Sequence, residues 1–223
     1  SFGRCIYCLE SRPEEKLTDE HIIPFSLNGS LVIENAACER CRARSNEVYE
    51  NPTLQTMLLV PRLFLELNRR KKAEKKPPPL WPSGTAHLTS VENLAQFTVG
   101  LGEYPPIMLM LVLSPAGKLL GIDQRVHNKS RLWCYDFGAK EKTAQNVSAR
   151  QIVNPGKFGL MACKIAYCYA VAELGIEGFD GSDIRDLLAG KRDDVFNFFG
   201  GSIDDDRLPR NELHGLMLRE RNG

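Results

Sequence analysis

The sequence predicts an α+β protein in which a zinc-stapled unit at the N-terminus precedes a larger mixed domain. Two CxxC pairs with a histidine between them lie near the start of the chain, and short apolar runs followed by two helical patterns fill its later part. We expect residues 1–52 to form the zinc unit, residues 53–79 a helix and a basic, proline-rich linker, and residues 80–223 an α+β accessory domain. The polar tail is expected to belong to a longer native chain.

The four cysteines of the two CxxC pairs are the candidate ligands of a structural Zn²⁺ ion: Cys5, Cys8, Cys38 and Cys41. Two such pairs supply the four thiolates of a closed tetrahedral site. The pairs are separated by 29 residues, which is enough chain for a substructure. Two disulfides are the alternative, but the chain begins without an apolar secretory segment, and cytosolic proteins keep their thiols reduced.

The chain between the two pairs predicts a strand followed by a helix. In the run DEHIIP, Ile22 and Ile23 favour a buried strand and Pro24 ends its pairing, so His21 is expected at a strand end. The run ACERCRARSNEVYE contains good helix formers and places Asn46 and Glu50 one turn apart on the same face. We expect this helix to break near residues 51–52, where a proline follows Asn51.

Taken together, CIYC, DEHIIP and CERC resemble the HNH endonuclease family over about 46 residues. The resemblance implies a ββα-metal unit that hydrolyses phosphodiester bonds. It also implies that His21 is the general base, a role that a neutral imidazole suits near neutral pH. Glu20 takes the place of the acidic residue that precedes this histidine, which makes it the first candidate ligand of a catalytic Mg²⁺ or Mn²⁺ ion.

The remaining family positions indicate an HNN-like variant. Asn35, three residues before Cys38, is the candidate for the middle letter, which steadies the hairpin around the histidine. Arg42 directly follows the second CxxC, where relatives carry His or Asn, and an arginine cannot bind a cation. Asn46 lies one helical turn further on and is the candidate second ligand of the catalytic ion.

A basic run follows the zinc unit. RRKKAEKK at residues 69–76 precedes three prolines, a composition typical of a solvated linker. Next to a nuclease unit, the same cations are candidate phosphate contacts that read no bases. With two arginines of the predicted helix, the candidate nucleic-acid contacts are Arg42, Arg44, Arg69, Arg70, Lys71, Lys72, Lys75 and Lys76.

The accessory region predicts a small antiparallel sheet and two helices. AQFTVGL, PIMLMLVL, KLLGI and RLWCYDF have strand patterns. The clearest helix runs from Pro155 to residue 174 and is apolar nearly all round, so Cys163 and Cys168 are expected in the core. A second helix at residues 181–190 is expected to begin at a Ser182 or Asp183 cap and to end at a glycine.

With the family resemblance, these patterns predict a metal-dependent endonuclease that acts on DNA, and the resemblance implies a setting of bacterial restriction or phage defence. The alternative is a catalytically inactive zinc module that binds nucleic acid or a protein partner, with Arg42 marking lost metal binding. The net charge of +1 restricts nucleic-acid affinity to local patches. We expect a cytoplasmic bacterial protein without a membrane segment, and a homodimer or larger defence complex.

Overall fold

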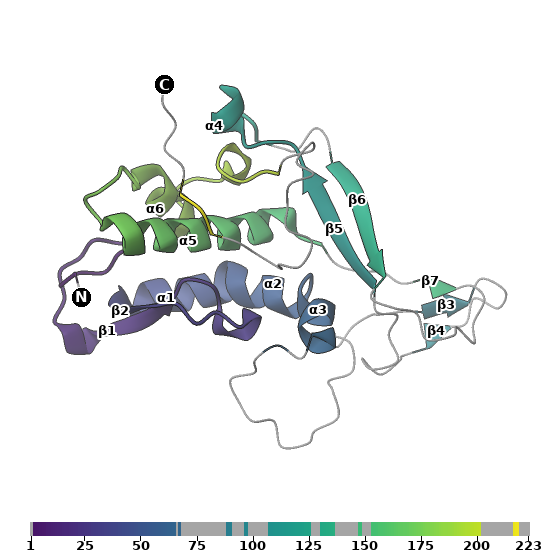
Figure 1. Cartoon of the computed structure of the whole chain (residues 1–223), viewed down its shortest axis with the longest axis horizontal. Coiled ribbons are helices and arrows are strands. Elements are labelled where there is room, and N and C mark those ends of the chain that lie inside the picture. The colour runs from purple at the N-terminus through teal and green to yellow at the C-terminus, as the bar shows by residue number, and fades with distance from the viewer. Residues whose placement is uncertain are drawn as a thin grey trace, which may run out of the picture.

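The computed structural model of the chain describes residues 2–65, 67, 88–90, 96–97, 107–125, 130–136, 147–148, 153–201 and 216–218. A short hairpin and a helical run form the N-terminal unit, and a long helix from the C-terminal part of the chain lies alongside that run (Figure 1). The predicted mixed α+β fold class is confirmed.

The N-terminal hairpin consists of the antiparallel strands β1 (Leu17–His21) and β2 (Val32–Cys38). The pairing register shifts between Thr18 and Glu20, which marks a bulge at this point of the ladder. His21 is the last residue of β1, as predicted, and pairs with Val32 at the start of β2.

The helical run after the hairpin is continuous, so the predicted break near Asn51 and Pro52 is wrong. Helix α1 (Glu39–Ser45) passes through a π-helical turn (Asn46–Glu50) directly into α2 (Asn51–Gln55). Pro52 is the second residue of α2 and directly follows the π-helical turn, so the run continues through a residue that lacks the N–H for an i→i−4 hydrogen bond. The short helix α3 (Leu59–Phe64) follows and likewise carries its proline near its start.

The accessory region contains two antiparallel sheets among its described residues, where the sequence predicted one. Strands β5 (Ile107–Leu113) and β6 (Ser130–Asp136) pair along their full length. A smaller sheet has the order β4–β3–β7, and its strands are β3 (Leu88–Ser90), β4 (Gln96–Phe97) and β7 (Val147–Ser148). The predicted strand in AQFTVGL is therefore β4, and PIMLMLVL and RLWCYDF correspond to β5 and β6.

The prediction of a strand at KLLGI, residues 118–122, is wrong, because this segment forms the helical turn α4 (Gly117–Leu120). Its leucines are exposed, so no sheet buries the apolar pattern that suggested a strand. A tertiary contact holds the chain instead: the backbone N–H of Gln124 donates to the side-chain oxygen of Asn197 at 2.6 Å. The contact lies just after α4 and ties the chain there to the C-terminal part.

The two predicted helices of the C-terminal part are present as α5 (Pro155–Leu174) and α6 (Ser182–Ala189). The side chain of Asn154 caps α5 by accepting a hydrogen bond from the backbone N–H of Lys157. The predicted caps of α6 are wrong, since Gly181 occupies its N-cap position. Gly190 ends α6 as predicted, with the positive φ of 73° that glycine adopts readily.

One hydrophobic core joins the N-terminal unit to α5. The Tyr167 hydroxyl donates a 2.5 Å hydrogen bond to the carbonyl of Ile6, and the Tyr7 hydroxyl lies 3.1 Å from the Cys168 sulfur. Cys163 and Cys168 are buried, which confirms their predicted place in the core. The zinc unit and α5 therefore share buried contacts although they lie far apart in the sequence.

Within the described residues, none of the helices combines the length and the apolar character that crossing a bilayer requires. The division into units at residues 52 and 79 stays a prediction.

Candidate metal centre and cavity at His21

The four predicted zinc ligands converge on one point. The sulfur atoms of Cys5, Cys8, Cys38 and Cys41 all lie within 4.8 Å of one another, and Cys8 and Cys38 are 3.9 Å apart. Tetrahedral zinc with bonds of about 2.3 Å separates its sulfur ligands by about 3.8 Å. Because a disulfide brings its sulfurs to about 2.05 Å, the arrangement fits a Zn²⁺ ion and not two disulfides.

Thiolate chemistry at this cluster also favours a metal. A hydrogen bond with the Cys41 thiol lowers the pKa of Cys5 to about 4, and the backbone N–H of Cys38 adds to the effect from 3.4 Å. The hydrogen bond with Cys5 raises the pKa of Cys41, and burial raises the pKa of Cys8, so the sulfurs compete for protons, and Cys5 is the one most inclined to the thiolate form that binds zinc. The cluster ties the chain before β1 to the junction of β2 and α1.

A cavity of about 640 Å³ opens between the end of β1 and the helical run, beside the cysteine cluster. Its polar lining residues are Asp19, Glu20, His21, Ser26, Glu39, Arg42, Ser45, Asn46, Glu47, Asn51, Glu50, Gln55, Arg62 and Lys164. The structure thus brings three predicted catalytic residues, Glu20, His21 and Asn46, to the wall of the same cavity. Their catalytic roles stay predictions.

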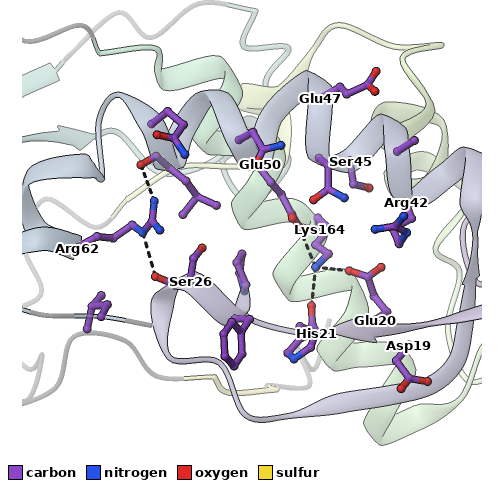
Figure 2. Close-up of a pocket in the computed structure, with 18 of the residues that line it drawn as sticks. Asp19, Glu20, His21, Ser26, Arg42, Ser45, Glu47, Glu50, Arg62 and Lys164 are labelled. Carbon is purple, nitrogen blue, oxygen red and sulfur yellow. Dashed lines mark hydrogen bonds and ion pairs between the residues drawn. The ribbon is translucent and has the colours of Figure 1, made fainter. Parts of the chain in front are cut away.

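The inner wall of this cavity holds a buried triad of one cation and two carboxylates (Figure 2). The Lys164 Nζ lies 2.5 Å from Glu20 Oε1 and 3.0 Å from Glu50 Oε1, and it donates a hydrogen bond of 2.6 Å to the His21 carbonyl. Only 1% of the Lys164 side chain is exposed. Glu50 Oε1 accepts no hydrogen bond within the described part of the chain, so its attraction to the ammonium is coulombic.

Burial and charge oppose each other in the triad. Burial raises the pKa of Glu20, while its attraction to Lys164 acts in the opposite direction. Burial alone would lower the pKa of Lys164, but the surroundings of Cys168, Glu50 and Glu20 outweigh it and raise the pKa above its ordinary value. Lys164 therefore stays protonated at neutral pH and neutralises one of the two buried carboxylates.

The triad puts a positive charge against Glu20, the predicted ligand of a divalent ion. The Lys164 ammonium already touches Glu20 Oε1 and fills the space in which an ion would contact that oxygen. At an effective dielectric constant of about 20, an ammonium about 4 Å away repels a divalent ion by about 8 kcal/mol, which offsets about half of the attraction of a carboxylate oxygen at about 2.1 Å. The role of Glu20 as a ligand of Mg²⁺ or Mn²⁺ stays a prediction.

His21 lies at the point where β1 leaves the sheet. Its side chain is half-buried and lines the cavity, and its ring meets the Phe25 ring edge-on at a centroid distance of 5.7 Å. The hydrogen bond from Lys164 fixes the main chain of His21 from the opposite side. The imidazole is therefore held between an aromatic contact and a fixed backbone, in reach of a molecule in the cavity.

The hairpin bulge contains Asn35, the predicted middle residue of the motif. Asn35 adopts the left-handed conformation with φ 48°, and its backbone N–H donates a 3.0 Å hydrogen bond to the side chain of Asp19. This contact spans the two strands next to Glu20 and His21. Asn35 contributes to this contact through its backbone, and its role in the motif stays a prediction.

The predicted arginine contacts lie in two different places. Arg42 lines the cavity and pairs with Glu39 through bonds of 2.7 and 2.9 Å. Arg44 points to α6, where its Nε donates to the Leu188 carbonyl at 2.9 Å. The six cations of the basic run at residues 69–76 lie outside the described residues.

The sequence patterns did not single out Lys164, and they gave Glu50 no role beyond its place one turn from Asn46. Lys164 lies in the middle of a mainly apolar helix, and a lysine in that position requires a buried partner. Glu50 lies in the π-helical turn, and such turns are frequent at functional sites. The first signal is present in the sequence, but it does not indicate which carboxylates the lysine meets.

Comparison with known proteins gives one match. Residues 5–56 match the family model of the HNH endonucleases. Searches of curated proteins and of solved structures found no match to the chain. The matched segment contains the four cysteines, the hairpin, the helical run and all three cavity residues predicted for catalysis. This match suggests a metal-dependent nuclease that interacts with nucleic acid, and it supports placing the unit of residues 5–56 in the HNH endonuclease family.

Proposed function

We propose that this protein is an endonuclease that hydrolyses phosphodiester bonds in DNA, in a setting of bacterial restriction or phage defence. The observation that carries the proposal is the position of His21, which lines a cavity of about 640 Å³ inside the segment that matches the family model. A cavity next to a rigid hairpin end can hold a phosphodiester against the imidazole. The zinc centre then has a structural role.

In the proposed reaction, the His21 imidazole accepts a proton from a water molecule that attacks phosphorus. Lys164 holds the main chain at His21 through the carbonyl bond of 2.6 Å, and Phe25 limits the rotation of the ring. In the chemistry of the family, a divalent ion such as Mg²⁺ or Mn²⁺ stabilises the departing oxygen. Asn46, which lines the cavity, is the candidate ligand that remains.

DNA would be held mainly through its phosphates. Arg42 lines the cavity and directly follows the zinc ligand Cys41 in the sequence. A third of its side chain is exposed. The basic run at residues 69–76 follows the matched segment and supplies six further cations. Contacts of this kind orient a duplex without reading its sequence.

An inactive zinc module that binds nucleic acid or protein is the second candidate, and one observation favours it. The Lys164 ammonium is paired with Glu20, and Arg42 stands at the position where relatives carry a ligand. Two of the expected ligand positions are therefore not open to an ion. Such a module would keep the zinc centre and the cationic surface while lacking the reaction.

Plasmid nicking separates the two candidates. The zinc-loaded protein is incubated with supercoiled plasmid and Mg²⁺ or Mn²⁺, and the same samples are run on a gel-shift assay. The enzyme is expected to convert plasmid to relaxed or linear forms and to stop when EDTA removes the divalent ion. A shift of the DNA without any cutting, with either ion, would instead identify the binding module.

A further inference from the structure

The Lys164 ammonium is surrounded by oxygen atoms in the way that a bound metal ion is. Its oxygen neighbours come from β1 and from the π-helical turn: Glu20 Oε1 at 2.5 Å, the His21 carbonyl at 2.6 Å and Glu50 Oε1 at 3.0 Å. Two carboxylates and a main-chain carbonyl are the oxygen donors that hard cations prefer. The cation here is part of the chain itself.

The helix that carries Lys164 holds the ammonium in place. Lys164 lies near the middle of α5. Its neighbours Met161, Tyr167 and Cys168 are buried in the core shared with the N-terminal unit. The Tyr167 hydrogen bond to Ile6 anchors the same stretch of the helix. With 1% of its side chain exposed, Lys164 cannot leave the triad unless α5 moves away from β1.

We propose that Lys164 is the resident cation of this cavity: a positioning residue that fixes Glu20 and the main chain at His21 and keeps divalent ions off Glu20. The site would then be built from two distant parts of the chain, with α5 supplying the cation and the segment of residues 5–56 supplying the oxygens. The inference deepens the proposed function, because it states which oxygens of the cavity a divalent ion cannot use.

Binding of Mn²⁺ in the absence of DNA tests the proposal in two proteins that keep Lys164, the wild type and one variant. Isothermal titration and Mn²⁺ electron paramagnetic resonance are applied to the full, zinc-loaded chain and to Glu20→Gln. If Lys164 keeps ions off Glu20, both proteins bind Mn²⁺ with affinities that agree within about twofold, whatever that affinity is. An affinity at least tenfold weaker in Glu20→Gln would make Glu20 an ion ligand and overturn the proposal.

Replacing the ammonium by a neutral side chain of similar length gives the complementary test. In Lys164→Met, the oxygens of Glu20 and Glu50 are released, and a new Mn²⁺ site is expected. At a Mn²⁺ concentration about 100 times its Kd, the ion should raise the melting temperature of Lys164→Met by about 5 to 10 °C. In the double variant that also carries Glu20→Gln, Mn²⁺ should cause no such rise. Lys157→Met, on the same helix but outside the triad, is the control and should gain no site.

A folded Lys164→Met protein that binds Mn²⁺ no better than the wild type would overturn the proposal. If this variant does not fold, the comparison of the wild type with Glu20→Gln still decides the question. None of these measurements uses nucleic acid or cleavage. An inactive protein with the expected Mn²⁺ behaviour would therefore refute the proposed function and leave the role of Lys164 intact.

Discussion

Cys38→Ser is expected to abolish zinc binding and to unfold the N-terminal unit. A structural zinc ion contributes its binding free energy to folding, on the order of 10 kcal/mol or more in small zinc domains. This exceeds the whole stability of many domains, which is about 5 to 15 kcal/mol. Cys38 is also 2% exposed and belongs to the core that contains Tyr7 and Tyr167, so the loss should spread to the docking of α5.

Zinc content by mass spectrometry and thermal unfolding by circular dichroism check this expectation. Cys163→Ala is the matched control, because Cys163 is a buried cysteine of α5 that is not part of the four-sulfur cluster. The control should keep its zinc and lose only a small packing contribution. If Cys38→Ser retains both the zinc and the melting temperature of the wild type, the four-thiolate assignment is wrong.

Lys164→Met is expected to lower the free energy of unfolding by about 3 to 5 kcal/mol near neutral pH, as happens when one partner of a buried ion pair is removed. Among the described residues, the Lys164 ammonium is the cation that pairs with both carboxylates, so its loss leaves Glu20 and Glu50 buried without that opposite charge. The effect should be measured by denaturant unfolding in the absence of divalent ions. Lys157→Met should change the stability by less than about 1 kcal/mol.

The pH dependence of this loss follows from the pKa of Glu20. Burial raises that pKa above the ordinary value of 4.5, and removing Lys164 takes away the charge that opposes the rise. A carboxyl group with a raised folded-state pKa stabilises the fold below its unfolded-state pKa, and this contribution is lost as the pH rises through the folded-state value. The difference between wild type and Lys164→Met should therefore be larger at about pH 8 than at about pH 5. An equal difference at both pH values would contradict the buried-charge explanation.

Features set by local spacing could be predicted from the sequence. The two CxxC pairs lie at chain positions that one hairpin brings together, and the four sulfurs do form one cluster. The long helix α5 was also predictable, since Pro155, Gly175 and an apolar run specify its start, end and burial within one continuous segment. Each of these signals is contained in residues that are close to one another in the chain.

Features set by distant contacts could not be predicted in this way. Lys164 meets the His21 carbonyl across 143 positions of sequence, and no local pattern indicates that pairing. The turn α4 looked like a strand because its apolar residues suggested burial, whereas Leu119 and Leu120 are exposed in the structure. The same limit applies to the ammonium that α5 places against Glu20, which no local pattern indicates.

The most direct test of His21 as the general base of a nuclease is single-turnover cleavage of one labelled DNA duplex. The wild type and His21→Ala are compared, and DNA affinity is measured on the same samples. Loss of a general base costs about 10² to 10⁴ in rate. The Lys164 contact involves the main chain of His21, so the alanine variant should keep its zinc, its fold and its triad. The cleavage rate of His21→Ala should therefore be lower by that factor at unchanged DNA affinity. Cleavage by His21→Ala at the wild-type rate would contradict this assignment.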